Sequence, residues 1–145
     1  MPRFAIITSE FNLEVTNGLK AGAVAALKEN GTRDDQIDFF DAPGAYELPL
    51  LAQTAAETKR YAGVIALGCV IKGDTAHFEF ISLSAAMGLQ EGALRTRVPI
   101  GFGVLTTYNE EQALIRSRQG AENKGREAAL AVLKTVRVRE QILNG

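Results

Sequence analysis

The chain has 145 residues and a mass of 15.6 kDa, which is the size of one ordinary domain. Hydrophobic residues make up 46% and charged residues 23% of it, a composition that excludes a disordered or fibrous protein. The 16 Lys and Arg residues and 17 Asp and Glu residues leave a formal charge of −1, so we expect no nucleic-acid partner and no membrane partner.

Few side chains are available for metal or disulfide chemistry. Cys69 is the only cysteine and His77 the only histidine, which excludes an internal disulfide and any site built from several Cys or His ligands. The apolar run near the amino terminus is too short for a signal peptide. The longest apolar run, Tyr61 to Ile71, is shorter than the roughly 20 residues of a bilayer-spanning helix. We therefore expect a cytoplasmic protein that uses no metal.

Four apolar runs predict β-strands, and helical segments separate them. The runs are continuous rather than alternating, which is typical of strands buried on both faces of a parallel sheet. The strands are expected at Phe4–Thr8, Ile37–Asp41, Gly63–Ile71 and Ile100–Thr106. The helices are expected at Leu13–Asn30, Leu48–Arg60 and Thr75–Arg95, then from Thr107 through Ile115, and finally over Glu122–Ile142.

Local signals set several of these helix ends. Gly31 is a C-cap signal for the first helix, because glycine adopts the left-handed backbone that ends many helices. Pro49 lies in the first turn of the second helix, where a missing N–H costs nothing. Thr107 and Glu110 have the spacing of a capping box, which predicts a helix start at Thr107.

Strands that alternate with helices predict one α/β domain over residues 1–145. Its expected architecture is a flavodoxin-like three-layer sandwich with a four-stranded parallel sheet and helices on both faces. Open parallel sheets bind ligands beyond the carboxyl ends of their strands. The segments that follow the four strands are 9–12, 42–47, 72–77 and 106–107, and the unusual residues of the sequence gather in them. We therefore expect the functional site at this edge.

His77 is the strongest single candidate at that edge. It lies in the first turn of a predicted helix, after Gly73, Asp74 and Thr75. A helix amino terminus favours an anion such as phosphate, and histidine transfers protons near neutral pH. The alternatives from the residues alone are a surface histidine without a role and an ordinary capping turn before it.

Other candidates also have two interpretations. Phe11 either stacks on a planar heterocycle or fills the core. Gly44 either lets the backbone approach a ligand closely or forms a tight turn. Arg116, Arg118 and Lys124 either bind an anion or form a solvated basic surface near a helix end.

Six segments, in order from about Phe4 to about Leu133, together resemble the lumazine synthase (6,7-dimethyl-8-ribityllumazine synthase) family. Each segment alone is a weak signal, whereas six in the same order are a specific one. The segments are Phe11-Asn12, Pro43–Pro49, Gly68–Phe78, Phe102–Thr107, Glu111–Ala113 and Asn123–Ala129.

The resemblance implies a transferase of riboflavin biosynthesis. Members of this family condense 5-amino-6-(D-ribitylamino)uracil with 3,4-dihydroxy-2-butanone 4-phosphate to 6,7-dimethyl-8-ribityllumazine, and phosphate and water leave. The resemblance also implies small-molecule substrates, no metal or organic cofactor, and a homopentamer with active sites at subunit interfaces.

The resemblance assigns a role to each matching position. His77 would transfer protons with assistance from Glu127, and Arg116 would hold the phosphate. Phe11 would stack on the pyrimidine. The other substrate-binding positions are Asn12, Gly44, Ala45 and Glu47 at the ribityl chain, Val70 and Ile71 at the pyrimidine, Gly73, Asp74 and Thr75 at the phosphate, and Phe102 and Lys124, which with Arg116 would come from a neighbouring subunit.

Glu10 and Lys72 depart from the family pattern, which often has arginine at the first of these positions and usually has it at the second. The sequence has no room for the extra amino-terminal strand of shell-forming members before Phe4, so we expect a free pentamer. Three alternative functions remain open: a non-catalytic module that binds lumazines or flavins, a structural assembly protein, and a generic receiver or flavoprotein. The segment after the first strand lacks the acidic cluster of a receiver and the phosphate loop of a flavodoxin.

Overall fold

Four parallel strands form one sheet in the computed structural model, which describes residues 2–145. The strands are β1 (Phe4–Ser9), β2 (Ile37–Ala42), β3 (Gly63–Ile71) and β4 (Ile100–Thr107). Their order across the sheet is β2-β1-β3-β4, and every neighbouring pair is parallel. This order places β1 and β3 in the centre and leaves β2 and β4 at the two edges.

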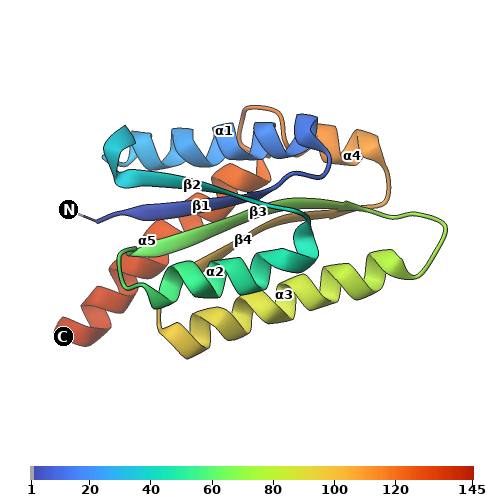
Figure 1. Cartoon of the computed structure of the whole chain (residues 1–145). Coiled ribbons are helices and arrows are strands. Elements are labelled where there is room, and N and C mark those ends of the chain that lie inside the picture. The colour runs from blue at the N-terminus through green and yellow to red at the C-terminus, as the bar shows by residue number, and fades with distance from the viewer. Residues whose placement is uncertain (1) are drawn as a thin grey trace.

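Helices cover both faces of the sheet, as Figure 1 shows. One face carries α1 (Leu13–Glu29), α4 (Glu110–Ile115) and α5 (Lys124–Asn144). The other carries α2 (Leu48–Glu57) and α3 (His77–Thr96). Two short 3₁₀ turns, Asp34–Gln36 and Ala45–Glu47, precede β2 and α2. The prediction of a three-layer α/β sandwich with a four-stranded parallel sheet is confirmed.

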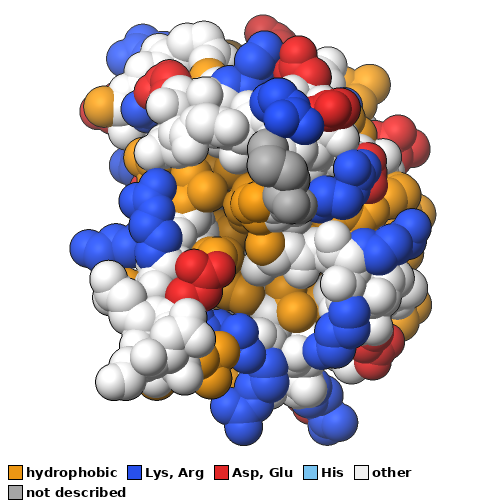
Figure 2. Space-filling model, turned by 90° about the vertical axis from the view of Figure 1, so that its left-hand side faces the viewer, with side chains coloured by type: hydrophobic (Ala, Val, Ile, Leu, Met, Phe, Trp, Pro, Cys, Tyr) orange, Lys and Arg blue, Asp and Glu red, His pale blue; other side chains and the backbone are white. Residues whose placement is uncertain are grey.

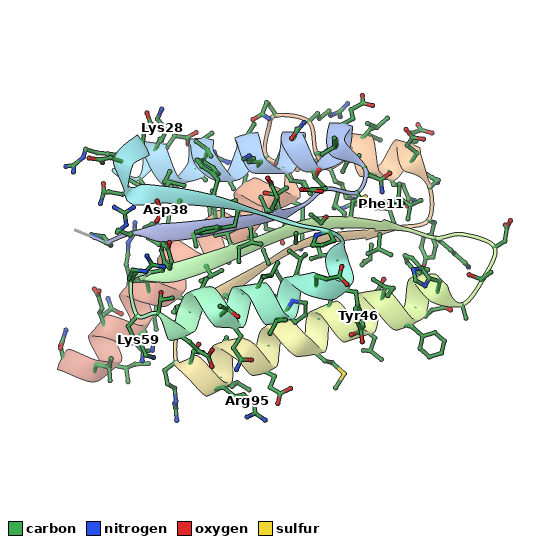
Figure 3. All side chains as sticks on the ribbon, in the orientation of Figure 1. Phe11, Lys28, Asp38, Tyr46, Lys59 and Arg95 are labelled. Carbon is green, nitrogen blue, oxygen red and sulfur yellow. The ribbon has the colours of Figure 1, made fainter. Side chains whose placement is uncertain are left out.

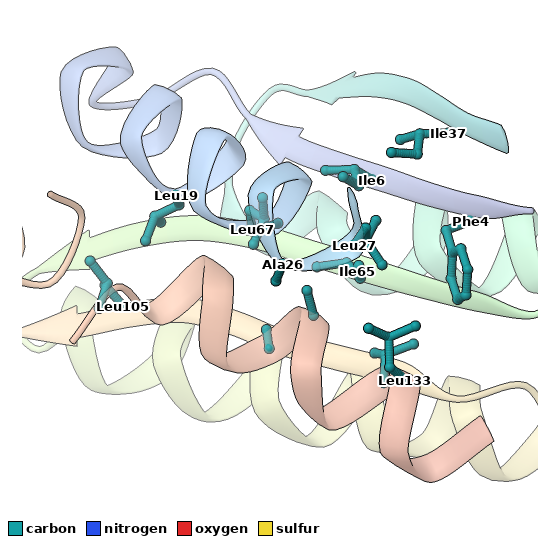
Figure 4. Close-up of a cluster of buried hydrophobic side chains, with 14 of the residues drawn as sticks. Phe4, Ile6, Leu19, Ala26, Leu27, Ile37, Ile65, Leu67, Leu105 and Leu133 are labelled. Carbon is teal, nitrogen blue, oxygen red and sulfur yellow. The ribbon is translucent and has the colours of Figure 1, made fainter. Parts of the chain in front are cut away.

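A hydrophobic cluster fills the space on each side of the sheet. Figure 4 shows the cluster between the sheet, α1 and α5, to which Leu19, Leu27, Ile65 and Leu67 contribute fully buried side chains. On the other face, Ile7, Val64 and Val104 pack against Leu48 and Leu89 of α2 and α3. Alternate residues of β1 and β3 point into opposite clusters, which explains why these strands are continuously apolar.

The edge strand β2 contradicts the expectation that all four strands are buried on both faces. Phe39 and Phe40 are exposed by 46% and 45%, and only the end residues Ile37 and Ala42 are buried. Phe102 of the other edge strand, β4, is also exposed. The sheet order is the cause, because an edge strand has a neighbouring strand on one side only and incomplete cover by helices.

The predicted capping box at Thr107 is also wrong. Thr107 is the last residue of β4, and its hydroxyl donates to the Asn109 carbonyl oxygen at 3.0 Å. Asn109 is the N-cap of α4, and its side-chain oxygen accepts from the Gln112 N–H at 2.9 Å. Asn109 is itself a preferred N-cap residue, so α4 begins one short turn later than expected.

Other helix ends also differ slightly from the sequence prediction. The helix α3 begins at His77 rather than Thr75, and α2 ends at Glu57 rather than Arg60. The last helix begins at Lys124, after the N-cap Asn123, whose side-chain oxygen accepts from the Arg126 N–H. Helix ends depend on caps that periodicity does not define, so shifts of this size are expected.

The helices α1 and α5 pack closely because small residues lie at their contact. A Cβ atom at Gly125 would overlap the carbonyl oxygen of Leu19 on α1. The fully buried Asn123 joins the same region, since its side-chain amide donates to the carbonyl oxygens of Gly18, Ser117 and Arg118 at 2.9–3.1 Å. The start of α5 is therefore fixed against α1 and against the loop before it.

An ionic group joins three segments at the amino end of the strands, the end that Figure 2 shows with Lys and Arg side chains around a hydrophobic patch. Asp38 on β2 accepts hydrogen bonds from Arg3 and Tyr61, both at 2.7 Å. These bonds hold the pKa of the Asp38 carboxyl below its ordinary value, Arg3 contributing most.

Within residues 2–145, none of the helices has the length and hydropathy that a membrane span needs.

The contact at Gly125 predicts a large effect of one methyl group. We expect Gly125→Ala to lower the free energy of unfolding by about 1–3 kcal/mol, because a rigid backbone carbonyl occupies the required space. Thermal and urea denaturation would measure the loss. Gly73→Ala is the matched control, since nothing lies within 4 Å of a Cβ there. Equal stability of the two variants would contradict the proposed close packing.

Candidate active site

A pocket of about 590 Å³ lies at the carboxyl ends of the strands, at the edge that the sequence predicted. Figure 3 shows Phe11 and Tyr46 toward this end of the molecule and Asp38 toward the opposite end. Segments that follow β1, β2 and β3 converge on the pocket. Its lining residues are Phe11, Pro43, Gly44, Ala45, Tyr46, Glu47, Cys69, Val70, Ile71, Gly73, Thr75, His77, Phe78 and Ile81.

Phe11 contributes an aromatic face from the turn between β1 and α1. Its side chain is 67% exposed, so the interpretation that it fills the core is wrong. The next residue, Asn12, has a left-handed backbone with a φ of 59°, and its carbonyl oxygen accepts from the Val15 and Thr16 N–H groups. Asparagine tolerates this conformation better than most residues, so Asn12 sets the direction of the chain at Phe11. Its side chain does not line the pocket.

The segment after β2 brings a carboxylate close to the backbone. Gly44 lies in the extended region, with a φ of −159°, so no strained conformation requires glycine there. A Cβ at this position would lie 3.3 Å from Glu47 Oε1, which is tighter than usual. The absence of a side chain at Gly44 therefore lets the Glu47 carboxylate fold back over the turn. Ala45, Tyr46 and Glu47 form one 3₁₀ turn before α2.

The end of β3 and the start of α3 form the third wall. Val70 and Ile71 end the strand, and the exposed residues 72–76 lead to His77, the first residue of α3. The His77 N–H donates to the Thr75 hydroxyl oxygen at 3.4 Å. His77 is exposed, and the free N–H groups of a 20-residue helix begin beside it. Asp74 belongs to the same loop but does not line the pocket.

Four other predicted site residues form a separate group, which we call the second cluster: Phe102, Arg116, Lys124 and Glu127. None of them lines the pocket. Lys124 Nζ lies 5.7 Å from the centre of the Phe102 ring and 3.2 Å from Glu127 Oε1. The Lys124 N–H donates to the Arg116 carbonyl oxygen at 2.8 Å, which joins the end of α4 to the start of α5. One chain therefore divides its predicted site residues between the second cluster and the pocket, with Asn12 and Asp74 in the loops beside the pocket.

Five pocket residues were not predicted as site residues: Pro43, Tyr46, Cys69, Phe78 and Ile81. Pro43 and Tyr46 lie within a segment that carried the family resemblance. Ile81 follows His77 by four positions, so helical periodicity from His77 is the signal that finds it, and Phe78 ends the segment Gly68–Phe78 that carried the family resemblance. They supply apolar surface beside the imidazole.

Burial controls the state of Cys69. This thiol lies on β3 and is 3% exposed, and burial raises its pKa to about 11. The thiol is therefore protonated at neutral pH and is a poor nucleophile.

Among residues 2–145, no group of three or more His, Cys, Asp or Glu side chains is arranged to hold a metal ion.

Comparisons with known proteins agree on one family. The family described as 6,7-dimethyl-8-ribityllumazine synthase matches residues 1–140. The chain is 60% identical over 146 aligned positions to 6,7-dimethyl-8-ribityllumazine synthase 1 of Caulobacter vibrioides, covering 98% of this chain and 95% of that protein. It is 46% identical to 6,7-dimethyl-8-ribityllumazine synthases of Nitratidesulfovibrio vulgaris and Deinococcus deserti, covering 97% of this chain and 90% of each relative.

The buried thiol gives a direct prediction. A pKa of about 11, against the ordinary 9.0, makes the thiolate fraction at pH 7.5 about a hundredfold smaller. We expect Cys69 in the native protein to react with a thiol-specific disulfide reagent at least a hundredfold more slowly than in denaturant. Absorbance of the released reagent measures both rates. Equal rates in the two conditions would show that Cys69 is accessible and ionised.

Proposed function

The chain belongs to the 6,7-dimethyl-8-ribityllumazine synthase family, and we infer that it is the transferase that makes 6,7-dimethyl-8-ribityllumazine in riboflavin biosynthesis. It condenses 5-amino-6-(D-ribitylamino)uracil with 3,4-dihydroxy-2-butanone 4-phosphate, and it releases phosphate and water. The roles of individual residues, described next, are our proposal.

One observation supports the site assignment most: Phe11, Glu47 and His77 line the same pocket. The exposed face of Phe11 suits stacking on a pyrimidine ring. Glu47 and the backbone around Gly44 and Ala45 offer acceptors and donors for a polyol chain. We propose that the uracil binds between these two segments, with Val70 and Ile71 at the edge of the pyrimidine.

The loop before α3 suits the phosphate group of 3,4-dihydroxy-2-butanone 4-phosphate. Gly73 and Thr75 offer backbone N–H and hydroxyl donors, and the amino terminus of α3 favours an anion. The carboxylate of Asp74 would repel a phosphate, so we propose that only its backbone contributes. This arrangement brings the carbon chain of the butanone phosphate beside His77.

The reaction needs proton transfer at two points, and we propose that His77, which lines the pocket, serves both. The amine of the uracil attacks the ketone, and water leaves only after a proton reaches the carbinol oxygen. Loss of phosphate breaks a C–O bond, and a proton must leave the adjacent carbon. An imidazole accepts and donates protons near neutral pH. Holding both substrates in one pocket supplies a further part of the rate through orientation.

We propose that a neighbouring subunit supplies Phe102, Arg116, Lys124 and Glu127. These residues lie in the second cluster, apart from the pocket of their own chain. Arg116 would hold the leaving phosphate from the side opposite the α3 terminus, since charge-assisted bonds to phosphate are strong. Lys124 would contact the ribityl chain, Asn12 would lie nearby, and Glu127 would assist His77 across the interface.

Exposed apolar side chains on α3 support an oligomer. Phe80, Leu83, Met87 and Leu94 are exposed by 62–73%, and their spacing puts them on one face of the helix. An exposed apolar stripe of this length is typical of a surface that another subunit covers. We propose that the chain forms a cytoplasmic homopentamer and that this stripe contributes to its contacts.

The condensation assay tests the reaction, and His77→Ala tests the site. We expect the purified wild-type chain to accelerate lumazine formation over the uncatalysed background without added metal. We expect His77→Ala to lower kcat about tenfold to a thousandfold, with little change in the KM values, because a proton-transfer group is lost. Absorbance of the lumazine measures both.

Two results would contradict these expectations. Wild-type protein that binds a lumazine without turnover is a binding module. A His77→Ala variant as fast as wild type removes this residue from the mechanism. Arg95→Gln, in the exposed last turn of the same helix and away from the pocket, controls for general effects of mutating α3.

Mixing two inactive variants tests whether subunits share the site. We expect His77→Ala and Arg116→Ala each to be impaired. Unfolded together in equal amounts and refolded, they should recover about a quarter of the wild-type activity, because one interface in four pairs an intact His77 with an intact Arg116 in a cyclic oligomer. Recovery is measured against each variant refolded alone. If both residues served one site within a single chain, every site would stay defective and no activity would return.

A further inference from the structure

We propose that Tyr108 is a positioning residue for the loop Lys72–His77 and thereby sets the affinity for the phosphate-bearing substrate. The proposal rests on the function proposed above for that loop. Tyr108 does not line the pocket, so it would act through the residues it contacts. The geometry of these contacts carries the inference.

Few contacts fix the position of the loop Lys72–His77. Every residue from Lys72 to His77 is exposed. The Lys72 N–H donates to the Thr107 carbonyl oxygen at 2.8 Å, which continues the pairing of β3 with β4. Within residues 2–145, no hydrogen bond joins Gly73, Asp74 or Thr75 to a strand or to a helix other than α3. Side-chain contacts at the two ends of the loop must therefore contribute to its position.

Tyr108 touches both ends of this loop. Lys72 Nζ lies 5.6 Å from the centre of the Tyr108 ring, which is the geometry of a cation–π contact. The Phe78 ring lies 6.2 Å from the Tyr108 ring at an interplanar angle of 39°, within the range of attractive aromatic pairs. Lys72 precedes the loop residues Gly73–Ala76, and Phe78 directly follows His77. One ring thus joins the end of β3 to the first turn of α3.

Hydrogen bonds and the neighbouring elements β4 and α4 hold the backbone of Tyr108 in place. Its N–H donates to Gln112 Oε1 at 2.9 Å. The residue before it, Thr107, ends β4, and the residue after it, Asn109, caps α4 through the Gln112 N–H. Because this backbone is already ordered, Tyr108 loses little backbone entropy when its ring contacts Lys72 and Phe78.

The contacts of Tyr108 use its ring and not its hydroxyl. The side chain is 69% exposed, and no hydrogen bond of the described chain involves the hydroxyl. Phe78 lines the pocket beside His77, so a shift of the Tyr108 ring changes both the wall of the pocket and the direction of the loop. The loop carries the groups proposed to bind phosphate, and the effect should therefore fall on the phosphate-bearing substrate.

The test compares three variants of the full-length protein. Tyr108→Leu removes the ring and keeps an apolar side chain, whereas Tyr108→Phe keeps the ring and removes the hydroxyl. Phe39→Leu is the matched control, because it removes another exposed ring with a lysine over it, Lys20 at 4.8 Å, on the edge strand β2. Melting temperature and oligomeric size are measured for each variant, so that any loss of folding is seen directly.

We expect Tyr108→Leu to raise the KM for 3,4-dihydroxy-2-butanone 4-phosphate about threefold to tenfold, the effect of losing one aromatic and one cation–π contact. The inhibition constant of inorganic phosphate should rise by a similar factor. The KM for the ribitylaminouracil should stay within about twofold, and Tyr108→Phe and Phe39→Leu should behave like wild type. A purely structural defect would instead change both KM values and the melting temperature.

Several results would overturn the proposal. Unchanged constants in Tyr108→Leu would show that the ring does not position the loop. Equal loss in Tyr108→Phe and Tyr108→Leu would assign the effect to the hydroxyl, and equal change in both KM values would exclude a specific effect on the phosphate loop. Wild-type protein without condensation activity would refute the proposed function itself, which separates that failure from failure of the positioning role.

Discussion

The parallel pairing of all four strands is the constraint on which the rest of this structure depends. Each strand enters the sheet at the same end, so the chain must leave it at the opposite end before every return. The segments after β1, β2 and β3 therefore meet at one edge, and the pocket lies there. The helices that return the chain cover the two faces and supply both hydrophobic clusters.

The same architecture separates the stable parts of the molecule from the parts available for chemistry. Ile6, Leu19 and Ile65 are fully buried in the core, whereas Phe11 and His77 are exposed side chains that line the pocket. A rigid sheet with exposed loops at its edge can thus carry polar and aromatic groups without disturbing the core. The division of the predicted site residues between the pocket and the second cluster extends this arrangement, since we propose that another subunit completes each pocket.

Particular residues show where prediction from sequence succeeds and fails. His77 was predicted in the first turn of a helix and lies at the first position of α3, because a Gly-Asp-Thr turn after an apolar strand is a local signal. Phe39 and Phe40 were predicted in a buried strand and are half exposed, because strand order decides which strand is an edge. Thr107 was predicted as a helix cap and ends β4, because Asn109 competes for the same role two residues later.

The sequence by itself determined the succession of strands and helices along the chain, the edge of the sheet at which the pocket lies, and the family to which the chain belongs. These follow from periodicity, caps and short motifs, which involve residues close together in the chain. Only the tertiary structure decided the order of the strands, the grouping of Phe102 and Lys124 apart from the pocket, and the contacts of Tyr108 with Lys72 and Phe78. These depend on the packing of elements that are distant in sequence, and no local pattern records which distant side chains will meet.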